Sequence, residues 1–134
     1  MRYFILAIAL CFLMVAPRAD AQQDEIRRVI SSQIEAFQVD DFTTAFEYAH
    51  PNIQGLFGTP QNFGRMVQQG YPMVWRPSDV KYRDLRVENG QTFQDVDVVD
   101  SAGRAFLLEY SMTQTADGWR ISGVRVLKSS QLSV

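Results

Sequence analysis

Residues 80–127 read VKYRDLRVENGQTFQDVDVVDSAGRAFLLEYSMTQTADGWRISGVRVL, and this stretch decides the fold. Its apolar residues largely alternate with polar ones, the period of two that is typical of strands with one buried face. Short turns interrupt the alternation at Asn89-Gly90 and near residues 101 and 116. Because connections this short join antiparallel neighbours, we predict a four-stranded antiparallel meander, with strands at 80–88, 92–99, 104–113 and 119–127.

One face of this sheet is expected to be covered. In the third predicted strand the residues on that face are all large and apolar: Phe106, Leu108, Tyr110 and Met112. In the first and last strands the apolar phase slips by one residue, after Tyr82 and near Gly123. Such slips predict β-bulges, and bulges predict a strongly curved sheet.

Upstream of residue 78 the apolar spacing becomes helical, with one stripe running from Ile26 to Phe37. A second helix is expected over 42–49, capped by Asp40 or Asp41 and ended by Pro51, with 52–58 as a turn or single helical loop. A third begins at Thr59-Pro60 and ends at Gly70 in a left-handed conformation. Residues 71–77 are expected to form an aromatic linker, with a short strand at 73–75 as an option. The predicted fold class is α+β: two or three N-terminal helices packed on a curved, cone-like sheet of four antiparallel strands.

The N-terminus has the layout of a secretory signal peptide. Arg2 precedes an apolar stretch at 3–16, and Ala19-Asp20-Ala21 supplies small residues before a predicted cut at Gln22. At about 1.5 Å per residue this stretch spans about 21 Å, short of the roughly 30 Å bilayer core. We therefore predict a signal peptide at 1–21, a single α+β domain at 22–134, export to the periplasm or outside of a bacterial cell, and no stable membrane insertion after cleavage.

Composition narrows the classes of function. The chain carries 13 basic and 15 acidic residues, a net charge of −2, which argues against nucleic-acid binding. Its one cysteine, Cys11, lies in the predicted signal peptide, so the mature chain has neither a disulfide nor a thiolate ligand. Because the chain also has only one histidine, we predict no metal site and no cofactor.

Several local phrases resemble one bacterial family. They include Ala36-Phe37, Asp40-Asp41-Phe42, Ala49-His50-Pro51, Leu56-Phe57-Gly58, Gly70-Tyr71-Pro72 and Gly118-Trp119-Arg120-Ile121. Over about residues 25–127 the chain is similar to the family catalogued as domain of unknown function 4864, which implies no activity and no catalytic residues. The order of helices and strands separately resembles the cone-shaped fold of nuclear transport factor 2 and its relatives, in which the sheet wraps round a pocket.

The strongest candidate site is the aromatic linker. Tyr71, Trp75 and Arg76 combine apolar bodies with polar tips and an arginine fork, and they are expected at a cavity mouth. The alternative is that Tyr71 and Trp75 seal the core while Arg76 pairs with a surface carboxylate. Further aromatic residues could line the same cavity or belong to the core: Tyr48, Phe57, Tyr110 and Trp119.

Two polar features have a structural explanation as well as a functional one. His50 is predicted chiefly to stabilise the C-terminus of the second helix, with a base or a polar handle for a ligand as the alternative. Asp95 and Asp97 share one face of a strand and are predicted to face water, with paired carboxylates or calcium ligands as the alternative. No residue is assigned a catalytic role.

The sequence thus predicts an exported domain that binds a small, mostly apolar ligand, with Arg76 or His50 as polar handle. A protein–protein interaction module, with a homodimer through the outer sheet face, is the first alternative. The second is an enzyme of the isomerase or dehydratase kind, with His50 or Asp41 as base and Tyr71 or Tyr110 as hydrogen-bond donor.

Overall fold

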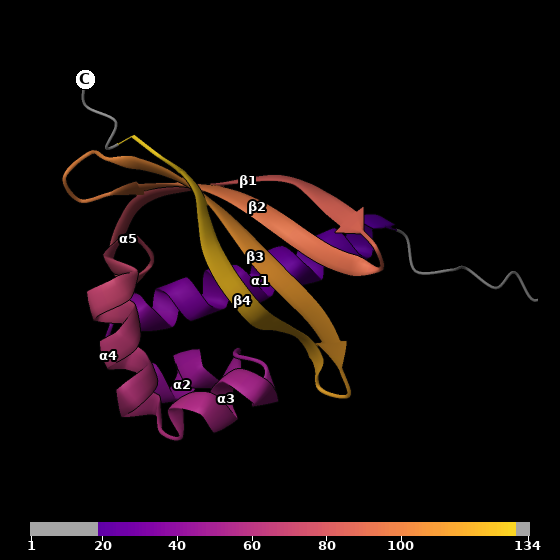
Figure 1. Cartoon of the computed structure of the whole chain (residues 1–134), viewed down its shortest axis with the longest axis horizontal. Helices are drawn as coiled ribbons and strands as arrows, with labels where there is room; N and C mark the ends of the chain where they lie inside the picture. Colours follow the sequence, from indigo (N-terminus) through magenta and orange to yellow (C-terminus); the bar gives the residue numbers. More distant parts are fainter. Residues whose placement is uncertain (1–18, 131–134) are drawn as a thin grey trace, which may run out of the picture.

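A computed structural model gives the structure of the protein and describes residues 19–130. Helices come first and strands follow, which confirms the α+β fold class (Figure 1). The helices are α1 (Ala19–Gln38), α2 (Phe42–Glu47), α3 (Pro51–Phe57), α4 (Pro60–Gly70) and α5 (Pro72–Trp75). The strands are β1 (Pro77–Glu88), β2 (Gln91–Asp100), β3 (Ala105–Thr115) and β4 (Gly118–Ser129).

Most of the predicted signal peptide, residues 1–18, lies outside the described residues. Residues 19–21 begin α1. Cleavage before Gln22 stays a prediction. Within residues 19–130 no helix is both long enough and apolar enough to span a bilayer.

The four strands form the predicted meander. Their order is β1-β2-β3-β4, and each neighbouring pair is antiparallel. The first hairpin turns through Asn89 and Gly90, whose φ angles of 51° and 77° match the type I′ turn that this dipeptide favours. Both predicted bulges coincide with register shifts, one between Tyr82 and Leu85 and one that leaves Ser122 as the extra residue of β4. The sheet is strongly twisted (Figure 1).

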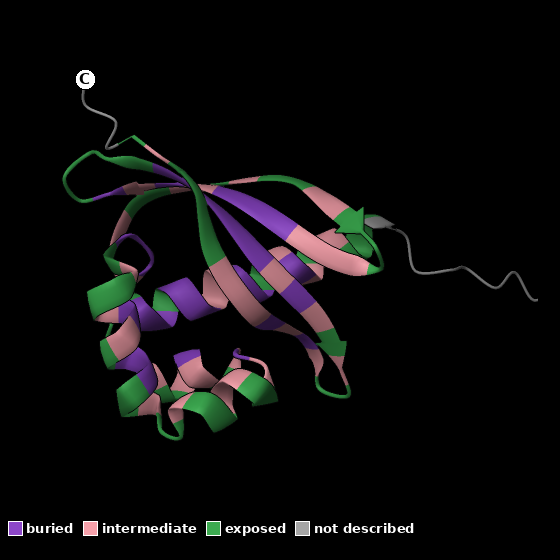
Figure 2. Ribbon diagram, viewed as in Figure 1, coloured by how far each residue is buried: buried purple, intermediate pink, exposed green. Residues whose placement is uncertain are grey.

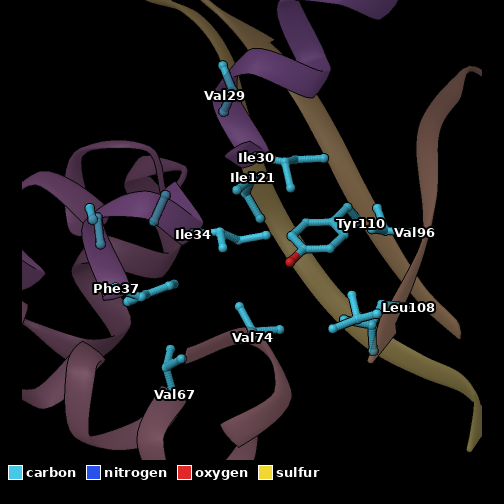
Figure 3. Packing of buried hydrophobic residues seen from close by; sticks show 14 of the residues in the cluster. Val29, Ile30, Ile34, Phe37, Val67, Val74, Val96, Leu108, Tyr110 and Ile121 are labelled. Atoms are coloured by element: carbon cyan, nitrogen blue, oxygen red, sulfur yellow. The ribbon is translucent and has the colours of Figure 1, made fainter. Parts of the chain in front are cut away.

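The helices cover one face of the sheet. The predicted inner residues of β3, from Phe106 to Met112, are at most 8% exposed, and Ile26, Ile30 and Phe37 of α1 join them in one apolar cluster. Figure 2 shows the buried residues where α1 and the strands face each other, and Figure 3 shows side chains of this cluster pointing into the space between the helices and the sheet. Burial of each such side chain stabilises the fold by about 1.5–3 kcal/mol.

The helical half is more divided than the sequence predicts. Residues 51–57 form a helix of their own, because His50 and Pro51 together begin a helix there rather than end the preceding one. Residues 72–75 form a helical turn, not a strand, since Pro72 occupies a first helical position. The start of α4 is as predicted, with the Thr59 hydroxyl accepting a hydrogen bond from Asn62 N. Gly70 ends that helix without a left-handed φ, because Tyr71 provides the C-cap.

Candidate ligand-binding site

A largely apolar pocket of about 240 Å³ lies where α3 and α4 face β4, with α1 and α5 contributing further wall residues. The positions of these elements can be followed in Figure 1. All lining residues except Gln33 and Tyr71 carry apolar side chains. The lining consists of Gln33, Phe37, Ala49, Ile53, Leu56, Phe57, Phe63, Met66, Val67, Tyr71, Val74, Ile121 and Val124.

Helix α3 forms the outer wall of the pocket, with Ile53, Leu56 and Phe57 among the lining residues. No residue of α3 is fully buried. Its entry is fixed to β4 by a short parallel bridge, in which His50 N donates to Ile121 O at 2.8 Å and Ile121 N donates to Tyr48 O at 2.9 Å. Leu56, on the same helix, is 77% exposed although it lines the pocket, so it marks the rim.

Two polar side chains belong to the pocket wall. Gln33, only 3% exposed, donates from Nε2 to Ala45 O at 3.1 Å. The hydroxyl of Tyr71 donates to Val124 O at 3.1 Å. Both donors therefore tie secondary-structure elements together, and the amide of Gln33 also carries a carbonyl oxygen, which is an acceptor.

Tyr110 adds a buried polar atom to the core behind this wall. The residue is fully buried, and its hydroxyl has no hydrogen-bond partner among the described residues. Figure 3 shows the hydroxyl pointing away from β3 toward Ile34 of α1 and Val74 of α5. Burial raises the pKa of this phenol, so the group is a neutral donor at any physiological pH.

Of the seven residues predicted to bind a ligand, Phe57 and Tyr71 line the pocket. Tyr48 and His50 lie in the connection between α2 and α3 instead, as the C-cap of α2 and the N-cap of α3. The Nδ1 atom of His50 accepts from Asn52 N at 3.1 Å, so this side chain caps the N-terminus of α3. The prediction that it caps the C-terminus of the preceding helix is wrong, because that helix ends at Glu47. The ring of Tyr48 lies beneath the guanidinium of Arg120.

Trp75 and Arg76 are joined to Asp40, at the end of α1. The indole Nε1 of Trp75 donates to Asp40 Oδ1 at 2.9 Å, and a guanidinium nitrogen of Arg76 donates to the same oxygen at 3.0 Å. Arg76 also stacks over the indole, with its carbon Cζ 4.1 Å from the ring centroid, and donates to Phe37 O. This is the arrangement of the predicted alternative, in which Arg76 pairs with a surface carboxylate.

The outer face of the sheet carries an ionic network. Asp97 is an exposed partner of Arg83, at 2.8 Å. Asp95 is only 9% exposed and pairs with Arg86, also at 2.8 Å, so the prediction that it faces water is wrong. The reason is that Arg86 of the neighbouring strand lies over it. In the described residues no three His, Cys, Asp or Glu side chains cluster as a metal site would require.

A second depression of about 480 Å³ lies beside α3 and the β3–β4 turn. Its wall includes Glu47, Asp117 and Arg120, and much of it consists of exposed surface residues. Such a wall offers a small molecule little apolar area to bury, so the pocket between α3, α4 and β4 is the better candidate.

Sequence reasoning missed most of the pocket wall. Phe63, Met66 and Val67 have the spacing of the apolar side of a helix, and Gln33 lies off the apolar stripe that runs from Ile26 to Phe37. A polar residue directly before an apolar stripe position, as Gln33 is before Ile34, carries no signal that distinguishes a pocket group from a surface group.

The model of the family described as Domain of unknown function (DUF4864) matches residues 19–134. No curated protein and no solved structure gives a significant match. The similarity to the cone-shaped fold of nuclear transport factor 2 therefore rests on the order of helices and strands alone. The match spans every described element, and the chain is a member of the DUF4864 family.

Proposed function

We propose that the protein binds a small, uncharged, mostly apolar molecule in the pocket between α3, α4 and β4. The observation that carries this proposal is the composition of the wall, which is apolar apart from one amide and one phenol. No carboxylate, histidine, lysine or arginine is among the wall residues. A charged ligand would lose its hydration there without gaining a partner, which is costly.

The size of the pocket limits the ligand. An apolar cavity of about 150 Å³ accommodates benzene, and pockets for drug-sized molecules begin near 300 Å³. At about 240 Å³ the pocket suits a molecule between these two, for example one with two small rings. The exposed rim at Leu56 gives such a molecule a route of entry past α3.

The test is a titration with two hydrocarbon probes, rigid tetralin and flexible nonane, followed by thermal unfolding and calorimetry. A ligand that binds only the folded protein raises the melting temperature by mass action, so a shift of several degrees at saturation supports the proposal. If neither tetralin nor nonane binds, the proposal is overturned.

A pair of exposed variants locates the binding. Leu56 and Val87 are 77% and 68% exposed, and only Leu56 lines the pocket. Leu56→Asp places a charge at the rim and is expected to weaken probe binding several-fold, whereas Val87→Asp is expected to leave it unchanged. Equal effects of the two substitutions would place the binding elsewhere.

Export is part of the proposal and has its own test. The signal-peptide pattern of residues 1–21 supports it. Mass spectrometry of the native protein should find a mature N-terminus at Gln22, and a retained ligand should add its mass to the same spectrum. A chain that keeps residues 1–21 would contradict the proposed export but not the proposed pocket. The interaction-module and enzyme alternatives stay predictions.

A further inference from the structure

Among the described residues, two fully buried side chains carry a polar atom without a hydrogen-bond partner, namely the Tyr110 hydroxyl and Gln94 Oε1, and of these only the hydroxyl is a donor. Tyr110 is the largest of the fully buried side chains, with 0% exposure, and it lies at the centre of the inner face of β3. Buried hydroxyl groups nearly always have a hydrogen-bond partner, because an unmet donor costs free energy. By contrast, the other tyrosine beside the pocket, Tyr71, donates to Val124 O.

The Tyr110 hydroxyl points toward the side of the core on which the pocket lies. The ring points from the sheet toward the helices, and its oxygen faces Ile34 and Val74 (Figure 3). Val74 is a wall residue of the pocket, as are Phe37 and Val67, which lie beyond it. Tyr110 is not itself part of the wall. Ile34 is not part of the wall either, so a ligand group has to pass between Ile34 and Val74 to reach the hydroxyl.

The surroundings of the Tyr110 hydroxyl limit the kind of ligand group that can bind to it. Ile34 and Val74, the two side chains that the hydroxyl faces, are hydrocarbon. Gln94 Oε1, the unpartnered acceptor of the residue opposite Tyr110 in the ladder, makes no hydrogen bond with it. The missing partner is therefore an acceptor that the ligand brings. The acceptor must be neutral, because the wall holds no cation to compensate an anion. A ketone or ester carbonyl meets both conditions, since its oxygen accepts a hydrogen bond and carries no net charge.

We therefore propose that the pocket selects small apolar molecules that carry a carbonyl group, and that the Tyr110 hydroxyl donates a hydrogen bond to that carbonyl. This inference rests on the proposed function, because it needs the apolar pocket to be a binding site. It adds a specificity residue that is not in the pocket wall.

The experiment compares α-tetralone with tetralin, two bicyclic molecules that differ in one carbonyl oxygen. Calorimetry with the wild-type protein is expected to show tighter binding of α-tetralone, by about tenfold, the effect of supplying a buried donor with its acceptor. In Tyr110→Phe the affinity for α-tetralone should fall to that for tetralin, while tetralin binds as before. The matched control is Tyr82→Phe, which removes a hydroxyl that is paired with Ser31 outside the pocket wall and should leave the preference for α-tetralone intact.

A measurement on the wild-type protein keeps the inference testable if a variant fails to fold. The infrared carbonyl stretch of bound α-tetralone should lie at lower frequency than in hexane, because a hydrogen bond weakens the C=O bond. Equal affinity of wild type and Tyr110→Phe for α-tetralone, or an unshifted carbonyl stretch, would overturn the inference while leaving the pocket as a binding site. Failure of tetralin and α-tetralone alike to bind would remove the proposed function and the inference with it.

Discussion

Asp95 and Glu109 are directly opposite each other in the ladder between β2 and β3, and both are nearly buried, at 9% and 6% exposure. Two like charges in this position destabilise a sheet unless a cation lies between them. Arg86 of β1 is that cation, since it lies 2.8 Å from Asp95 and 2.6 Å from Glu109. Arg125 of β4 pairs with the other oxygen of Glu109 at 2.8 Å. The network therefore links all four strands on the face that the helices leave uncovered.

Replacement of Arg86 by Met should destabilise the protein. Methionine keeps an apolar stem but leaves the two facing carboxylates without their shared partner. We expect a loss of about 1–3 kcal/mol, less than for a fully buried pair because Arg86 is 31% exposed. Urea unfolding measures it. Arg83→Met, which breaks the exposed pair with Asp97, is the control and should have a much smaller effect. Equal losses in the two variants would contradict the role given to Arg86.

Glu109 should make the protein sensitive to acid. The hydrogen bond from Arg125, opposed by burial and aided by Arg86, holds the pKa of this carboxyl below its usual range. A carboxyl with a lowered pKa in the folded state stabilises the fold at pH values above its unfolded pKa of about 4.3. That contribution is lost as the pH falls through the lower, folded pKa. Urea midpoints measured from neutral pH down to about pH 3 should therefore fall less steeply for Glu109→Gln than for wild type. An unchanged slope would show that other carboxyls dominate.

Gly64 should be essential for the packing of α4 on α2. A Cβ atom at this position would lie 2.5 Å from two ring carbons of Phe42. Alanine stabilises a helix by about 1 kcal/mol relative to glycine. The steric overlap with the Phe42 ring outweighs this gain, so Gly64→Ala should lower the free energy of unfolding by about 1–3 kcal/mol. A Cβ atom at Gly55, in α3, would have no neighbouring side chain or other packed atom within 4 Å. Gly55→Ala should therefore be neutral or stabilising. Thermal unfolding of both variants checks the contrast, and a stabilised Gly64→Ala would show that the Phe42 ring moves aside easily.

Asp40 should control the environment of Trp75. Hydrogen bonds from Trp75 and Arg76 lower the pKa of the Asp40 carboxyl, against a partial opposing effect of burial. The indole N–H signal of Trp75 in a nitrogen–proton NMR spectrum is thus expected to titrate below the usual aspartate pKa of about 3.9. In Asp40→Asn the titration should vanish. Asparagine is suitable because Asp40 has a φ of 54°, a conformation that asparagine tolerates. The Trp119 indole is the internal reference, and parallel shifts of both signals would indicate global unfolding instead.

Sequence patterns predicted the sheet well because its determinants are local. Asn89-Gly90 specifies a tight turn by its own backbone preferences, and the phase slips after Tyr82 and before Gly123 are visible as breaks in alternation. The boundaries of the helices were harder to predict from the sequence. His50-Pro51 can end one helix or begin another, and the choice depends on the bridge between Ala49 and Ile121, more than 70 residues apart.

The sequence by itself determined that four strands follow a set of helices, which face of the sheet is apolar, and to which family the chain belongs. The first two follow from side-chain periodicity and turn chemistry, which act over a few residues, and the third follows from local phrases that resemble the family. Only the tertiary structure decided that Phe57 and Tyr71 share a pocket with Gln33 and that Arg76 pairs with Asp40. It also decided that the Tyr110 hydroxyl has no partner among residues 19–130. Pockets and buried polar atoms arise where helices and strands distant in sequence fail to fill space or to pair, and no local pattern records such a mismatch.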